Sequence, residues 1–389
     1  TNMIKRPTLK PLRPQFSSGP CVKRPGWDIT EIMRTAYLGR SHRAKDPKFQ
    51  IQKIIELTKE ILEIPENYKV GLVPASNTGA FEIAMWTLLG KLPVDIFAWE
   101  NFGLAWATDI IEQLKIKDYR LISSDYGRLP DMTAARVRSD ICFTWNGTTS
   151  GVRVPDAKWL SNCKGLVLCD ATSAVFGQKV AWEKLDAITF SWQKAMGGEA
   201  AHGMLVLSPK AIDRLESYIP DRPIPKVFRL VKNGKLIEEI FLGETINTPS
   251  MLCVADALDS LEWLKRLGGL NTTTSRTTEN FNTVQDWLDQ QDWIENLVTI
   301  PAHRSTTSVC LKIIAKEFLD VPIDKQRQFI KYLVDLLETE KVAFDIGSHR
   351  EAPPGFRIWC GVTVENKDLC LLLPWLSWAF ESSKNLLLQ

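Results

Sequence analysis

Short apolar segments alternate with helical stretches in the first half of the chain, and this order restricts the fold more than any other feature. The segments are continuous and bounded by turn residues, which is typical of strands buried on both faces. They lie at 69–74, 95–99, 119–123, 140–144, 166–170, 187–190 and 203–207. We therefore predict an α/β fold in which helices cover both faces of a mostly parallel, seven-stranded sheet.

The length of the chain, 389 residues, suits two domains better than one. Residues 1–15 are basic and proline-rich, and we expect an extended leader there or the remnant of a removed targeting peptide. A large domain is predicted over 16–267 and a smaller α+β domain over 268–389, with Gly268-Gly269 as the hinge. The smaller domain is expected to contain helices at 278–291, 325–340 and 367–382 and strands at 308–314 and 357–360.

The composition favours a cytoplasmic protein with small-molecule partners. Lys and Arg number 48 against 46 Asp and Glu, so the net charge of +2 creates no field that would attract nucleic acid or an anionic membrane. No apolar run approaches the roughly 20 residues that cross a bilayer. The eight cysteines show no C-x-x-C spacing. We expect them to be reduced, and we expect no bound metal.

The run Ser191-Trp192-Gln193-Lys194 follows a predicted buried strand and precedes a glycine-rich loop. Burial disfavours the ammonium form of a lysine and lowers its pKa, which suits Schiff-base chemistry. A solvated loop lysine is the alternative. Asp170 ends another predicted strand, and parallel strands present their carboxyl ends to one crevice, so Asp170 and Lys194 are expected to meet.

A lysine that faces a carboxylate is the arrangement that pyridoxal phosphate requires. The lysine holds the cofactor's aldehyde, and the aspartate keeps the pyridine nitrogen protonated. This pairing alone does not identify the cofactor.

Six motifs together give the chain a resemblance to a known family. They are Phe16-Ser17-Ser18-Gly19-Pro20, Ser41-His42-Arg43, Asp170, Gln193-Lys194, Asn247-Thr248-Pro249 and His349-Arg350. In order and spacing they resemble the phosphoserine aminotransferases, which belong to class V of the fold-type I pyridoxal-phosphate enzymes. The resemblance runs from about Phe16 to the C-terminus. It implies the fold-type I architecture, with Lys194 and Asp170 as catalytic residues and the Phe16–Pro20 segment across the substrate cleft.

The turn at 75–79 precedes a predicted helix, whose free N-terminal amides suit an anion. An ordinary helix N-cap is the alternative. The resemblance implies that Asn77 and Thr78 hold the cofactor phosphate there, mainly through backbone amides. This turn lacks the glycine-rich character of many relatives, which leaves the roles of its side chains open.

The resemblance also implies contacts to the cofactor ring. Trp106 matches the stacking tryptophan, with Phe102 as the alternative and a purely structural role for Trp106 as a third possibility. Thr148 is expected to reach the phenolic oxygen. Gln193 is expected to donate to the phosphate, and Ser173 is a neighbour of the cofactor.

Asn247 and Thr248 match a motif that, in the resembling enzymes, reaches the cofactor phosphate of the other subunit. The resemblance therefore implies a homodimer. An N-cap before the helix predicted at 254–267 is compatible with this role, because the same free amides serve both purposes.

Two histidine–arginine pairs are the expected substrate anchors. Arginine's planar fork binds carboxylate or phosphate bidentately. By the resemblance, Arg357 holds the α-carboxylate, while His42, Arg43, His349 and Arg350 hold the phosphate of phosphoserine or the side-chain carboxylate of glutamate. For His42 and Arg43 a solvated pair before a helix is an equal alternative.

The expected reaction is reversible transamination between O-phospho-L-serine with 2-oxoglutarate and 3-phosphohydroxypyruvate with L-glutamate, in serine biosynthesis. Use of the related substrate on the route to vitamin B6 (pyridoxine) stays open. The alternatives are an alanine–glyoxylate type aminotransferase, a cysteine desulfurase, and a non-catalytic dimeric relative that keeps the fold.

Overall fold

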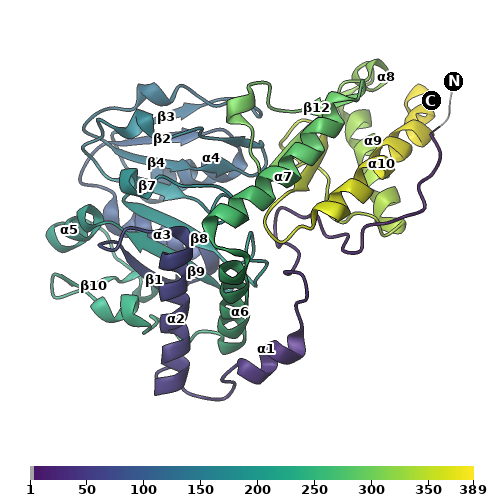
Figure 1. The fold of residues 1–389 in the computed structure, drawn as a ribbon. Helices are drawn as coiled ribbons and strands as arrows, with labels where there is room; N and C mark the ends of the chain where they lie inside the picture. Colours follow the sequence, from purple (N-terminus) through teal and green to yellow (C-terminus); the bar gives the residue numbers. More distant parts are fainter. Residues whose placement is uncertain (1–3) are drawn as a thin grey trace.

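The computed structural model describes residues 4–389, and a seven-stranded sheet organises its larger part (Figure 1). The strand order is β1-β9-β8-β7-β4-β2-β3. All neighbours pair in parallel except β9, which runs antiparallel to β1 and β8. The prediction of a mostly parallel seven-stranded α/β sheet is confirmed. The strands are β1 (Lys69–Pro74), β2 (Val94–Ala98), β3 (Tyr119–Ser123), β4 (Asp140–Thr144), β7 (Val167–Asp170), β8 (Ala187–Ser191) and β9 (His202–Leu207).

Helices bury both faces of this sheet because successive strand residues point to opposite sides. Val70 and Leu72 pack with α2 and α6, whereas Val73 packs with α3 on the other face. The helices of this part are α1 (Ile29–Thr35), α2 (Lys45–Leu62), α3 (Ser76–Leu88), α4 (Asn101–Thr108), α5 (Pro209–Ser217) and α6 (Met251–Leu267), and a π-helical turn (Asp109–Gln113) follows α4. Both layers leave the carboxyl edge of the parallel strands uncovered.

The C-terminal part forms a separate layer, on the right of Figure 1, with its own apolar core. An antiparallel sheet of β12, β13 and β14 packs with helices that include α7 and α10. The elements are α7 (Leu270–Asp289), β12 (Ile294–Asn296), β13 (Ser308–Ile313), α8 (Lys316–Leu319), α9 (Ile323–Thr339), β14 (Gly355–Trp359) and α10 (Asn366–Ser383). The small α+β unit has the predicted order of elements. Division of the chain into domains at residue 268 stays a prediction.

Helix α7 starts at Leu270, eight residues before the predicted start at Thr278. Its first turns are rich in threonine, which disfavours helix in a sequence-based reading. In the structure the Thr273 hydroxyl donates to Phe176 O, and the Thr277 hydroxyl donates to Thr273 O at 3.0 Å. These buried hydroxyls are satisfied by carbonyls, so the helix continues back to the glycine pair.

Asn233-Gly234 forms the predicted tight hairpin, with φ of 53° and 75° at its two central residues. The paired strands, β10 (Val231–Lys232) and β11 (Lys235–Leu236), are shorter than the flanking segments suggest. Helical 3₁₀ turns at Lys226–Phe228 and Glu238–Leu242 take up the remaining residues.

The described part of the leader, residues 4–15, lies along the C-terminal unit (Figure 1). The Trp375 indole donates to Leu9 O at 2.8 Å, and Phe344 N donates to Pro14 O at 2.9 Å. Phe16 and Cys21 then enter the apolar core of that unit. Residues 4–22 together form a strap that leads from the C-terminal unit to the uncovered edge of the large sheet. Over residues 4–389, no helix combines the length and apolar character needed to cross a membrane.

Candidate active site

A cavity of about 270 Å³ opens at the carboxyl ends of β4, β7 and β8. This is the edge at which ligands bind in open α/β sheets. Most of the residues predicted to hold a cofactor line it together: Asn77, Thr78, Trp106, Thr148, Asp170, Ser173, Gln193 and Lys194. Phe102, the alternative to Trp106, lines the cavity as well, so the structure leaves the choice between the two stacking candidates as a prediction.

Lys194 follows β8 in a loop that returns to β9, and it is buried. Its Nζ donates to Ser18 O, in the segment predicted to cross the cleft. Burial lowers the pKa of Lys194, and the nearby Arg357 guanidinium lowers it further, whereas Asp170 and Glu100 oppose the shift. The amine is thereby brought closer to the neutral form that attacks carbonyl carbon.

Asp170 stands at the end of β7 in the same cavity. Its Oδ1 accepts from Thr172 N, and its Oδ2 accepts from the Trp106 indole, each at 3.0 Å. Burial raises the pKa of Asp170, while these two hydrogen bonds work against the rise. Each carboxylate oxygen has a second lone pair, so the group can accept one more donor from inside the cavity.

The first turn of α3 forms one wall of the cavity, through Ser76, Asn77 and Thr78. Its amides have no acceptor within the helix and carry the positive end of the helix dipole. Ala75 and Ser76 have φ of 67° and 59°, a left-handed conformation that normally favours glycine. Ala75 and Ser76 therefore adopt a backbone conformation that glycine adopts more easily, and the backbone is strained at both residues.

The wall of the cavity fits pyridoxal phosphate. Asn77 Oδ1 and Thr144 Oγ1 are buried there and have no hydrogen-bond partner among the described residues. A ligand with polar groups would satisfy them. The lysine, the carboxylate and the free amides of α3 supply the three anchors that an aromatic aldehyde with a ring nitrogen and a phosphate needs.

Ser173 and Gln193 are already engaged inside the protein. The Ser173 hydroxyl accepts from Asn146 Nδ2 at 2.9 Å and donates to Asn146 O at 3.0 Å. Gln193 Oε1 accepts from the Ser191 hydroxyl, which leaves the Gln193 amide hydrogens free for the predicted phosphate contact.

The C-terminal unit carries Arg357, whose charge acts on the cavity residue Lys194 although Arg357 does not line the cavity. Arg357 on β14 has a buried Nε without a partner among the described residues. The His349 ring lies 6.4 Å from the ring of Phe102, which lines the cavity. Burial lowers the pKa of His349, and Arg357 adds to this effect. Arg350 is exposed to solvent.

Seven predicted site residues do not line the cavity of their own chain. Three belong to the C-terminal unit, namely His349, Arg350 and Arg357, and the other four are His42, Arg43, Asn247 and Thr248. The chain nevertheless holds their two segments side by side. Lys48 Nζ forms an ion pair with Glu244 Oε1 at 3.1 Å, and Gln52 Nε2 donates to Leu242 O at 2.7 Å. Arg43, Asn247 and Thr248 are exposed. The elements that carry these groups are therefore in contact, and the four side chains lie outside the cavity that contains Lys194.

Glu100 is a cavity residue that the sequence reading did not single out. It is almost completely buried, and burial raises its pKa. A signal was available, because Glu100 follows β2 just as Asp170 ends β7, and strand ends at this edge carry the site.

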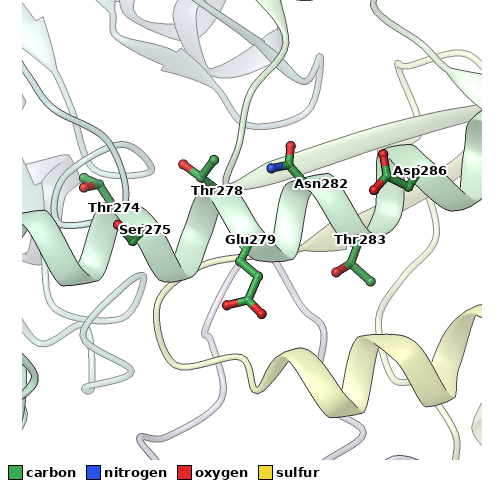
Figure 2. Close-up of a pocket in the computed structure, with 7 residues that line it drawn as sticks. All are labelled: Thr274, Ser275, Thr278, Glu279, Asn282, Thr283 and Asp286. Atoms are coloured by element: carbon green, nitrogen blue, oxygen red, sulfur yellow. The ribbon is translucent and has the colours of Figure 1, made fainter.

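A larger hollow of about 500 Å³ runs along α7 (Figure 2). All its lining residues belong to that one helix, and they are Thr274, Ser275, Thr278, Glu279, Asn282, Thr283 and Asp286. Thr283 Oγ1 already accepts from Asn366 Nδ2 of α10 at 2.8 Å, and the other lining residues come from the same helix, so they do not converge on a common point. The smaller cavity at the sheet edge, which side chains from several elements line, is the candidate functional site.

Comparison with known proteins agrees with this geometry. No family model matches the chain. The chain is 50% identical over 380 residues to a phosphoserine aminotransferase of Methanosarcina mazei. The aligned region covers 97% of this chain and 100% of that protein. This chain belongs to the phosphoserine aminotransferase family.

Solved structures of phosphoserine aminotransferases share its fold. The enzyme from Cytophaga hutchinsonii has a TM-score of 0.79 at 19% identity and covers 94% of this chain and 98% of its own. A phosphoserine aminotransferase from Trichomonas vaginalis, solved with bound pyridoxal phosphate, has a TM-score of 0.73 at 17% identity and covers 93% and 99%. The predicted fold-type I architecture is thus confirmed for this member of the phosphoserine aminotransferase family.

Backbone strain at the α3 turn predicts that Ala75→Gly stabilises the protein. A non-glycine residue in the left-handed region is disfavoured, so glycine should raise the free energy of unfolding by about 1 kcal/mol. Urea unfolding of the cofactor-free protein measures this. The control is Ala105→Gly in the right-handed part of α4, which should cost about 1 kcal/mol. A loss of stability in both variants would contradict the strain.

Burial of Lys194 predicts a specific pH dependence. Because its pKa in the folded protein lies below the ordinary value of 10.5, the unfolded chain binds more protons in that window, and stability rises with pH there. Cofactor-free wild type should therefore gain stability relative to Lys194→Met as pH increases from 7 toward 10. Urea unfolding across this range tests it. Lys91→Met, at an exposed position, should follow the wild-type curve, and a parallel curve for Lys194→Met would refute the prediction.

Proposed function

We propose that this chain transfers an amino group between O-phospho-L-serine and 2-oxoglutarate, reversibly giving 3-phosphohydroxypyruvate and L-glutamate, with pyridoxal phosphate in the cavity. The observation that carries the proposal is the buried lysine that shares one cavity with a buried carboxylate and a helix N-terminus. Membership of the phosphoserine aminotransferase family supports the choice of substrate.

Pyridoxal phosphate, when bound, supplies an aldehyde for the amine and a ring that withdraws electrons from the substrate's Cα. Lys194 would hold the cofactor at rest and, once released, move the proton at Cα. Asp170 would accept the hydrogen bond of the ring nitrogen. The first turn of α3 would bind the phosphate through Asn77 and Thr78, assisted by Gln193, and Thr148 would contact the ring oxygen.

The cationic groups near the cavity suit substrates with two or three negative charges. Arg357 acts on Lys194 electrostatically and has a free buried Nε, so we assign it the substrate's α-carboxylate. His349 and Arg350 lie on the loop before β14 and would hold the phosphate of one substrate and the side-chain carboxylate of the other.

We also propose a homodimer in which each chain completes the site of the other. The helix that follows His42 and Arg43 contacts the segment that precedes Asn247 and Thr248, yet none of the four lines its own cavity. Large apolar side chains are exposed on α1, α2 and α6, on the segment between α1 and α2, and at the end of the 3₁₀ turn Glu238–Leu242: Met33, Leu38, Phe49, Leu242 and Leu252. Such a surface is typical of an interface between subunits.

The thiols near the cavity argue against a cysteine desulfurase. Burial raises the pKa of both Cys21 and Cys310 to about 12, so neither forms the thiolate that a sulfur acceptor needs. All eight cysteines are free, which supports the proposed location in the cytoplasm.

Substrate choice tests the proposed reaction. With glutamate as amino donor, kcat/KM for 3-phosphohydroxypyruvate should exceed that for pyruvate or glyoxylate by about 10³-fold or more, because the smaller acids lack the phosphate that the cationic groups are proposed to bind. Lys194→Ala should lower kcat by about 10²–10⁴-fold, whereas Lys179→Ala, at an exposed position, should not. Equal use of pyruvate would instead favour the alanine–glyoxylate type of enzyme.

Subunit mixing tests the shared site. Lys194→Ala and the double variant His42→Ala/Arg43→Ala should each be nearly inactive. After the two are unfolded and refolded together, about a quarter of wild-type activity should return, because half of the dimers are hybrids and each hybrid has one complete site. If His42 and Arg43 served their own chain, no hybrid would contain a complete site, and the mixture would stay inactive.

A further inference from the structure

Glu100 links two parts of the cavity wall, the helix α4 and the loop that carries Thr148. Its Oε1 accepts from Gly103 N at 2.7 Å and so caps the N-terminus of α4, the helix that carries Trp106. Its Oε2 accepts from the Thr149 hydroxyl at 2.8 Å, in the loop that carries Thr148. One carboxylate therefore holds both elements.

The packing around Glu100 leaves little freedom. A Cβ placed on Gly147 would lie 2.8 Å from the Glu100 Cγ, so the loop backbone presses directly on this side chain. Asn101 Oδ1 also accepts from the Thr149 hydroxyl, at 2.5 Å. Glu100 is 1% exposed. Removal of the Glu100 carboxylate would leave Gly103 N without its acceptor, and the Thr149 hydroxyl would turn to Asn101 Oδ1 alone. The link between the loop and the capped end of the helix would be lost.

We infer that Glu100 is a positioning residue that sets the distance between Trp106 and Thr148, and through them the shape of the pocket for the cofactor ring. The inference rests on the proposed function, because it treats these two residues as ring contacts. It assigns Glu100 a role in cofactor affinity through Trp106 and Thr148, and no proton transfer of its own.

A purely structural helix cap would affect folding alone, so the test must separate stability from cofactor affinity. Ser208 provides the matched control. Its hydroxyl caps α5 by accepting from Ala211 N at 3.1 Å, and it donates to Asp186 Oδ1 at 2.7 Å. Like Glu100 it is buried and links a helix to a second segment, but it does not line the cavity.

The experiment titrates the cofactor-free proteins with pyridoxal phosphate and follows the absorbance of the lysine-bound cofactor and the quenching of tryptophan fluorescence. Glu100→Ala should raise the dissociation constant about 10–100-fold, by analogy with the effect of removing the hydrogen-bond partners that orient metal ligands. Glu100→Gln, which can still cap α4 and contact Thr149, should stay near the wild-type value. Ser208→Ala should lower the melting temperature without changing the dissociation constant.

Thr149→Val provides a second route if Glu100→Ala does not fold. It removes the hydroxyl on the loop side and keeps the cap on α4, so it should also weaken cofactor binding. In the double variant with Glu100→Ala, its effect should be smaller than alone, because both changes break one link.

Three outcomes are decisive. Wild-type affinity in either Glu100→Ala or Thr149→Val overturns the inference, as does a Glu100→Gln variant as weak as Glu100→Ala, because charge rather than position would then matter. A wild-type chain that binds no pyridoxal phosphate would overturn the proposed function itself, a result distinct from normal binding by all variants.

Discussion

The carboxyl edge of the parallel sheet is the constraint on which the whole site depends. Parallel strands end at the same edge of the sheet, so the sheet itself brings together residues that are far apart in the sequence. Asp170 at the end of β7 and Lys194 just after β8 become cavity neighbours for this reason. The strap of residues 4–22 and β14 of the C-terminal unit then close the open side with Ser18 and Arg357.

The cavity combines groups that burial drives toward their neutral forms. Burial lowers the pKa of Lys194 and raises those of Asp170 and Glu100, and the three act on one another across a small volume. Around them stand buried polar atoms without partners, among them Asn77 Oδ1 and Thr144 Oγ1. Buried polar groups without partners lower the stability of the cofactor-free protein. The cavity therefore favours a ligand that offers a hydrogen-bond partner or an opposite charge to each of these groups.

Much of this arrangement could be predicted from the sequence, because apolar strands and the residues after them follow simple periodicity. The strands, the Asn233-Gly234 turn and the place of Lys194 beside Asp170 are local properties of that kind. The start of α7 could not be predicted in this way, since the Thr273 hydroxyl is satisfied by the carbonyl of Phe176, which lies far away in the sequence. Glu100 was missed because a glutamate before a helix is normally only a cap. The placing of His42 away from its own cavity depends on tertiary packing that no local pattern encodes.

The antiparallel direction of β9 has a consequence for movement in the site. Because β8 and β9 pair along their lengths, the loop between them is fixed at both ends. Within it, the carbonyls of Trp192, Gln193 and Lys194 all accept hydrogen bonds from backbone amides, one of them from the strap. The main chain at Lys194 is therefore fixed by these hydrogen bonds. The Lys194 amine can move only by rotation about the bonds of its four-carbon side chain, so it can shift by no more than a few ångströms.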